Sequence, residues 1–179
     1  MIEIKQTEPY LSICKYPIIS LLIPNTWIEE AQEIISRDEG KRNKSWSEAR
    51  AIGCKAFGVY YNLKDQWIKK SKTDMVGYDA TEYVIEHDGV SYKFRTHTVL
   101  HKQPGAGLDK MDTRIFKSPD DYHPIYHVVC WYSLPRLYIV GYKPNDELKD
   151  SSVAINASNI YPMFTNKILN GIDNRGFFI

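Results

Sequence analysis

The segment that decides the fold runs from residue 81 to residue 100 and reads TEYVIEHDGVSYKFRTHTVL. Glu82 to Glu86 and Val90 to Leu100 are rich in β-branched and aromatic residues, which favour strands. His87-Asp88-Gly89 separates the two runs, and Asp-Gly supplies the positive backbone torsions of a tight turn. The segment is therefore predicted to form a β-hairpin.

Further strands are predicted toward the C-terminus. Ile125 to Tyr132 and Leu137 to Tyr142 are rich in Val, Ile, Tyr and Trp, and the short link between them indicates a second hairpin. Ile115-Phe116 is predicted to be a short strand, and Pro144 to Leu148 a turn that leads into a brief helix. The tail after Ser151 is weakly patterned, and the apolar Phe177 to Ile179 is expected to dock.

Toward the N-terminus the pattern changes to helices. The first 24 residues are predicted to be extended, with strands at Ile2 to Ile4 and at Leu11 to Tyr16. Two helices follow, because Thr26 to Glu29 and Ser45 to Glu48 both have the spacing of a capping box. In the second helix small residues recur along one face at Ala49, Gly53 and Ala56, which would let another backbone approach closely.

Helices followed by a run of strands favour an α+β fold over a doubly wound sheet. We expect N-terminal helices packed on a mainly antiparallel, mixed sheet. The 179 residues suit a single domain, with an N-terminal strand and helix extension over residues 1–44, a core over 45–148 and a tail over 149–179.

Composition excludes several classes of protein. The formal net charge of +1 argues against a strongly basic nucleic-acid coat protein, although it allows a local basic patch. The sequence contains no run of roughly 18 apolar residues, so no membrane span is predicted. The N-terminus lacks the features of a signal peptide. The three cysteines, Cys14, Cys54 and Cys130, are far apart and lie among apolar residues, so buried thiols in a reducing cytoplasm are expected.

Lys93-Phe94-Arg95 on the predicted hairpin carries the chemistry that the sequence suggests. Alternation along a strand puts Lys93 and Arg95 on one face and Phe94 on the other. Two adjacent cations do not hold a divalent metal, but they suit a phosphate group. The alternative is an ordinary solvated sheet face.

Other candidate sites are weaker. His97, His101, Asp109 and Asp112 include metal-ligand types, yet a four-residue spacing does not converge on a strand, so no metal site is predicted. Gly105-Ala106-Gly107 lacks the further glycine and the lysine of phosphate-binding loops. His127, beside Pro124, is interpreted as part of a strand entry.

Over roughly residues 45 to 148 the chain resembles a family of phage and prophage proteins with a restriction-endonuclease-like, PD-(D/E)xK core. Five segments carry the resemblance. They are a helix with small residues (Ala51–Phe57), an Asp-x-Gly segment that leads into a strand (Asp74–Gly77), and a strand with basic residues and Thr (Tyr92–Thr96). A Pro-Asp-Asp loop before an apolar strand (Ser118–Val129) and a closing strand (Leu137–Tyr142) complete the set.

The resemblance implies a retained nuclease-like fold whose active site is degenerate. Cys54 stands where the family has its helix Glu, and Lys93 stands where it has its strand Glu. Asp74 and the basic Arg95 remain. One carboxylate with two cations does not supply the oxygen ligands that Mg²⁺ needs. Glu82 or Glu86 on the neighbouring strand could replace the lost carboxylate.

Three functions follow as hypotheses. In the first, the protein binds DNA or phosphate without efficient cleavage, through Lys93, Arg95, Lys102 and Arg114, with no cofactor. In the second, it is an anti-defence protein that inhibits a bacterial immune enzyme through an aromatic surface, since 13% of its residues are aromatic. In the third, Asp74 with Glu82 or Glu86 forms a Mg²⁺-dependent nuclease. Residues 1–44 lie outside the resemblance and could serve dimerisation or target binding.

Overall fold

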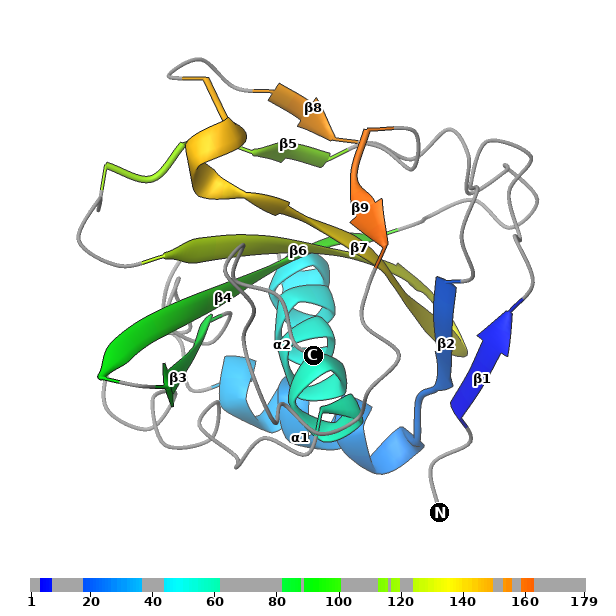
Figure 1. The fold of residues 1–179 in the computed structure, drawn as a ribbon. Coiled ribbons are helices and arrows are strands. Elements are labelled where there is room, and N and C mark those ends of the chain that lie inside the picture. The colour runs from blue at the N-terminus through cyan, green and yellow to red at the C-terminus, as the bar shows by residue number, and fades with distance from the viewer. Residues whose placement is uncertain are drawn as a thin grey trace.

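The computed structural model describes residues 4–7, 18–36, 44–61, 82–87, 89–100, 113–115, 117–119, 124–149, 153–155 and 159–162. Within these residues the chain has an α+β fold with two α-helices and a mixed, curled sheet (Figure 1). The predicted class is therefore confirmed. In chain order the elements are β1 (Ile4–Thr7), β2 (Ile18–Leu22), α1 (Asn25–Ser36), α2 (Lys44–Tyr60), β3 (Glu82–His87), β4 (Val90–Leu100), β5 (Thr113–Ile115), β6 (Ile125–Ser133), β7 (Arg136–Pro144), the short 3-10 helix η3 (Asn145–Glu147), β8 (Val153–Ile155) and β9 (Tyr161–Pro162).

The large sheet has the strand order β1-β2-β7-β6-β4-β3, and β9 adds to β7. The pairing of β4 with β6 is parallel, and the other pairings within this sheet are antiparallel. Both predicted hairpins, β3–β4 and β6–β7, are present. Gly89 takes a φ of 78° in the first turn, as the Asp-Gly signal predicted.

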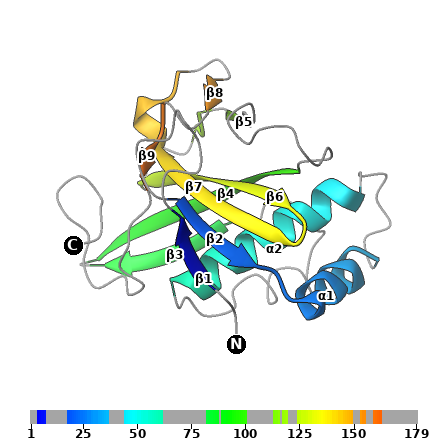
Figure 2. The same cartoon turned by 90° about the vertical axis from the view of Figure 1, so that its right-hand side faces the viewer.

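The helices pack on one face of this sheet, as Figures 1 and 2 both show. The main hydrophobic core lies between them, and aromatic side chains such as Phe57, Phe94 and Tyr126 form much of it. Helix α2 lies so close to β4 that a Cβ built at Gly53 would overlap the hydroxyl of Thr98. The small-residue face predicted for this helix is thus the face that meets the sheet.

The opposite face of the sheet carries a second, smaller layer. The two-stranded ribbon of β5 and β8 lies over it, together with η3 (Figures 1 and 2). A separate apolar cluster fills the space beneath, with Trp131 and Val129 from β6 and Ile115 from β5 at its centre. Strand β6 is consequently buried on both faces over Ile125–Tyr132.

Some boundaries differ from those predicted. Helix α1 begins at Asn25, so Thr26 lies inside the first turn and is not its cap. The backbone amide of Trp27 donates to the carbonyl of Pro24 at 3.0 Å, which closes the turn earlier than expected. The predicted tail contains β8 and β9, which no local pattern indicated. The strand predicted over Leu11 to Tyr16 and the docking of Phe177 to Ile179 fall outside the described residues.

None of the helices in the described part of the chain has the length and hydropathy needed to cross a membrane.

Candidate functional site

Strand β4 presents different chemistry on its two faces. Phe94, Thr96 and Thr98 are buried, and Phe94 belongs to the core beneath the helices. Alternation puts Lys93, Arg95 and His97 on the opposite face, where all three are partly exposed. This is the face on which the sequence predicted a pair of cations.

Arg95 is anchored by a loop that precedes β6. One of its terminal nitrogens, Nη1, donates to the Ser118 hydroxyl at 2.9 Å. Ser118 is in turn joined to Asn145 of η3 by a two-point contact. Its backbone amide donates to Asn145 Oδ1 at 2.7 Å, and Asn145 Nδ2 donates to its carbonyl at 3.1 Å. Hydrogen bonds therefore join three segments that are distant in sequence, namely β4, the loop at Ser118 and η3, beside the Arg95 guanidinium.

The same asparagine fixes a pair of histidines. His127 Nε2 lies 3.0 Å from Asn145 Oδ1, and His127 Nδ1 lies 2.8 Å from His97 Nε2. The Ser118 amide can only donate, so the atom facing it must be the Asn145 oxygen, which can only accept. His127 Nε2 consequently carries a proton. When both rings are neutral, His127 Nδ1 accepts a hydrogen bond from His97 Nε2. The lone pair of the neutral His97 ring is thus assigned to Nδ1.

The electrostatic surroundings of these histidines are positive. Burial, together with the charges of His127, Arg95 and Arg50, lowers the pKa of His97 from 6.5 to about 3. The described charges that act on His97 all have the same sign. His97 is therefore neutral at neutral pH, and its surroundings favour an anion.

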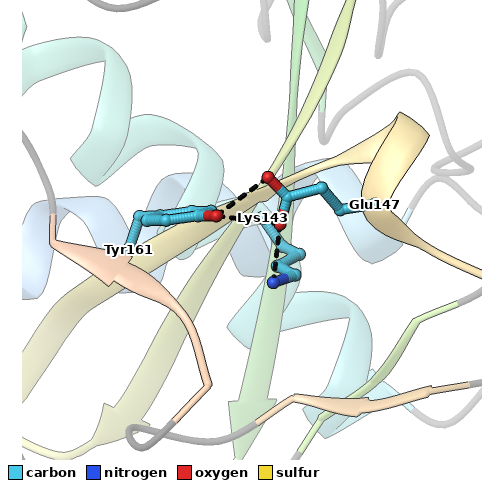
Figure 3. A network of polar contacts seen from close by, with 3 residues as sticks. All are labelled: Lys143, Glu147 and Tyr161. Atoms are coloured by element: carbon cyan, nitrogen blue, oxygen red, sulfur yellow. Dashed lines mark hydrogen bonds and ion pairs between the residues drawn. The ribbon is translucent and has the colours of Figure 1, made fainter. Parts of the chain in front are cut away.

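A second polar cluster joins this face to the strand β9. Lys143 is opposite His127 in the β6–β7 register, and its Nζ lies 2.8 Å from Glu147 Oε2. The Tyr161 hydroxyl donates to the Glu147 carboxylate, with distances of 2.9 and 3.0 Å to its two oxygens (Figure 3). The Lys143 ammonium also lies 5.0 Å from the centre of the Tyr161 ring. These contacts hold η3, which carries Asn145, against the sheet.

The residues predicted from sequence are distributed as follows. Lys93 and Arg95 share the face described above, and Arg114 is exposed on β5. Glu82 is opposite Arg95 in the β3–β4 register and Glu86 is opposite Ser91, but their side chains lie outside the described part of the chain. Whole residues outside it are Asp74, His101, Lys102, Asp109 and Asp112.

Sequence reasoning missed the centre of the site. It interpreted His127 as part of a strand entry and Asn145 as part of a turn, and it gave Ser118 no role of its own. The alternation of β6 carries a signal for His127, because Tyr126 and Val128 face the helices. No local signal shows that His127 meets His97, since that contact depends on the parallel pairing of β4 with β6.

Metal and thiol chemistry find no support among the described residues. These contain no group of three or more His, Cys, Asp or Glu side chains that could hold a metal ion. Cys54 and Cys130 are buried thiols, as predicted, and burial raises the pKa of the Cys130 thiol well above its ordinary value. What the site offers chemically is a set of fixed cationic and hydrogen-bonding groups.

Comparisons with family models, with curated proteins and with solved structures find no match to this chain.

Proposed function

We propose that this protein binds the phosphate backbone of DNA without cleaving it, on the face of β4 that carries Lys93 and Arg95. The observation that carries the proposal is the anchored Arg95, whose guanidinium is fixed by Ser118 on the same strand face as Lys93. Guanidinium groups held in a fixed geometry suit phosphate oxygens. Arg114 on β5 is exposed and, with Lys102, is proposed to contribute further phosphate contacts.

The proposal includes a phage-type, nuclease-like core that has lost its chemistry. Segments that carry the family resemblance lie in α2, β4, β6 and β7, and these elements pack on one another, whereas Asp74–Gly77 lies outside the described residues. That arrangement supports the resemblance. The cation of Lys93 in the position of the family's strand carboxylate is the reason to expect binding without cleavage.

The experiment is a titration of a short fluorescein-labelled DNA duplex, followed by anisotropy at several salt concentrations. Lys93→Ala/Arg95→Ala is expected to bind more weakly and to lower the salt dependence of log K by about two, because two phosphate contacts are lost. Unchanged affinity and salt dependence in this variant would contradict the proposal.

The matched control is Arg136→Ala/Lys149→Ala, which removes the same charge elsewhere. Arg136 is also a strand arginine, and its Nη1 donates to the Ser20 hydroxyl at 3.1 Å, much as Arg95 donates to Ser118. Lys149 is exposed beyond η3. If net charge alone drives binding, both double variants lose the same affinity, and a specific site on β4 is ruled out.

The anti-defence hypothesis gains no specific support from the described residues. The tryptophans and tyrosines whose side chains are described are largely buried. The exposed large apolar side chains are Val90 on β4, Leu134 in the turn after β6 and Tyr161 on β9, and of these only Tyr161 is aromatic. A contiguous aromatic docking surface is not formed by these residues.

A further inference from the structure

The hydrogen-bond chain that ends at His97 leaves one defined place for a further proton. His127 Nε2 and His97 Nε2 both carry hydrogens that are already donated, and His127 Nδ1 already accepts. Nδ1 of His97 can add a proton while each of these hydrogen bonds persists. The protonated pair would place a positive charge on the ring two residues along β4 from Arg95.

We propose that the His97–His127 pair takes up one proton from solvent, at His97 Nδ1, when a DNA phosphodiester binds beside Arg95. This inference rests on the proposed function and adds its regulation. A phosphodiester has no proton to donate to the Nδ1 lone pair, so an uncharged His97 offers it no hydrogen bond. With the proton in place the same nitrogen becomes a donor, and its charge is offset by the anion.

The surroundings of the pair determine the direction of this coupling. Arg95 on β4 and Arg50 on α2 act on His97 with positive charge, and His127 on β6 is its hydrogen-bonded neighbour. From β7, Lys143 lies opposite His127 in register and is paired with Glu147 of η3. Arg114 is exposed on β5, whose strand has contacts with β4. In the free protein these charges oppose protonation of His97, and a bound anion would offset them.

The contact with Asn145 makes the pair a proton acceptor at one end only. The Asn145 oxygen accepts a hydrogen bond from His127 but does not take up its proton, and this oxygen is held in place by the backbone amide of Ser118. Protons therefore enter at His97 and do not pass on into η3. The histidines thus respond to what lies beside β4.

The test is calorimetric titration of the full chain with the same DNA duplex, in buffers that differ in ionisation enthalpy. We expect uptake of up to one proton per complex in mildly acid buffer, and affinity that rises by up to about tenfold for each unit that the pH falls. His97→Gln retains an amide donor toward His127 but cannot be protonated. Its affinity is expected to depend less steeply on pH than that of the wild type.

A second measurement on the wild type does not depend on whether the variant folds. The ¹⁵N shifts of the ring nitrogens distinguish neutral and charged histidine, and we expect His97 to become charged on addition of DNA at constant pH. Binding of DNA with no proton uptake and an unchanged neutral His97 would overturn the coupling and leave the proposed function intact. Failure to bind DNA at any pH would overturn the proposed function itself.

Discussion

Asn145 links the polar groups of the site at the scale of single residues. Its side chain accepts from the Ser118 amide and from His127, and it donates to the Ser118 carbonyl, all in a buried setting. Removing it breaks these three buried hydrogen bonds. Asn145→Ala is therefore expected to lower the free energy of unfolding by about 1–3 kcal/mol, measured by urea denaturation.

Ser118→Ala is the matched control for that prediction. It removes only the hydroxyl that accepts from Arg95 and keeps the backbone groups that bind Asn145. A smaller loss of stability is expected. Equal losses in the two variants would show that the Asn145 contacts contribute nothing beyond the Arg95 anchor.

The low pKa of His97 also predicts how stability depends on pH. Burial and the neighbouring charges lower the pKa from 6.5 to about 3 in the folded state. Between these values the unfolded chain binds a proton that the folded chain does not, so stability is full above about pH 6.5 and decreases as the pH falls. The contribution reaches at most about 1.4 kcal/mol per pH unit.

Urea denaturation at a series of pH values from neutral to mildly acid checks this prediction. His97→Gln cannot titrate, so its stability is expected to decrease less steeply over the same range. Parallel curves for the wild type and the variant would show that His97 is protonated as easily in the folded as in the unfolded chain.

At the scale of elements, the close packing of α2 on β4 depends on Gly53. Gly53→Ala raises helix propensity by about 1 kcal/mol, but the added Cβ would overlap the Thr98 hydroxyl. We expect a net loss of about 1–3 kcal/mol from overpacking, read from urea denaturation. In a Thr98→Ala background the overlap is removed, and Gly53→Ala should then cost less or even stabilise. An equal cost in both backgrounds would contradict this account.

The strand β9 depends on the cluster of Lys143, Glu147 and Tyr161 (Figure 3). Glu147→Gln removes the ion pair and weakens the contact with the Tyr161 hydroxyl. We expect faster amide hydrogen exchange in β9, with a change in global stability below about 1 kcal/mol because the cluster is exposed. Asp146→Asn is the control, since no described hydrogen bond joins Asp146 to β9, and its exchange should match that of the wild type.

The same cluster has a defined dependence on pH. Partial burial raises the pKa of Glu147, but hydrogen bonds from Lys143 and Tyr161 outweigh this, and the net pKa lies below its usual 4.5. The carboxylate therefore stabilises the fold above that value, and this contribution is lost as the pH falls through the lower pKa of the folded state. Exchange in β9 should rise over that acid range and should do so less in Glu147→Gln.

At the scale of the whole molecule, the proposal predicts DNA binding without hydrolysis. Supercoiled plasmid incubated with the protein and Mg²⁺ or Mn²⁺ should stay intact, because the proposed resemblance puts Lys93 in the position of a carboxylate that would ligate the metal. Agarose gels and metal calorimetry provide the measurement. Nicking that is abolished by Asp74→Ala, or by Glu82→Ala or Glu86→Ala, would instead establish a nuclease in which Glu82 or Glu86 replaces the lost carboxylate.

Local sequence signals predicted much of this architecture. The α+β class, both hairpins, the two helices and the small-residue face of α2 follow from periodicity, turn residues and composition. Lys93 and Arg95 were correctly placed on one face of β4, because alternation along a strand is a local property. Burial of Cys54 and Cys130 likewise followed from their apolar neighbours.

The tertiary structure decided what no local pattern encodes. The parallel pairing of β4 with β6, separated by residues 101–124, brings His127 to His97, and η3 brings Asn145 to both. Such contacts depend on which strands become neighbours, and that choice is governed by the packing of the whole core. The sequence by itself therefore determined the two helices, the two hairpins and the cations of β4, whereas only the fold added β8 and β9 and assembled the histidine pair.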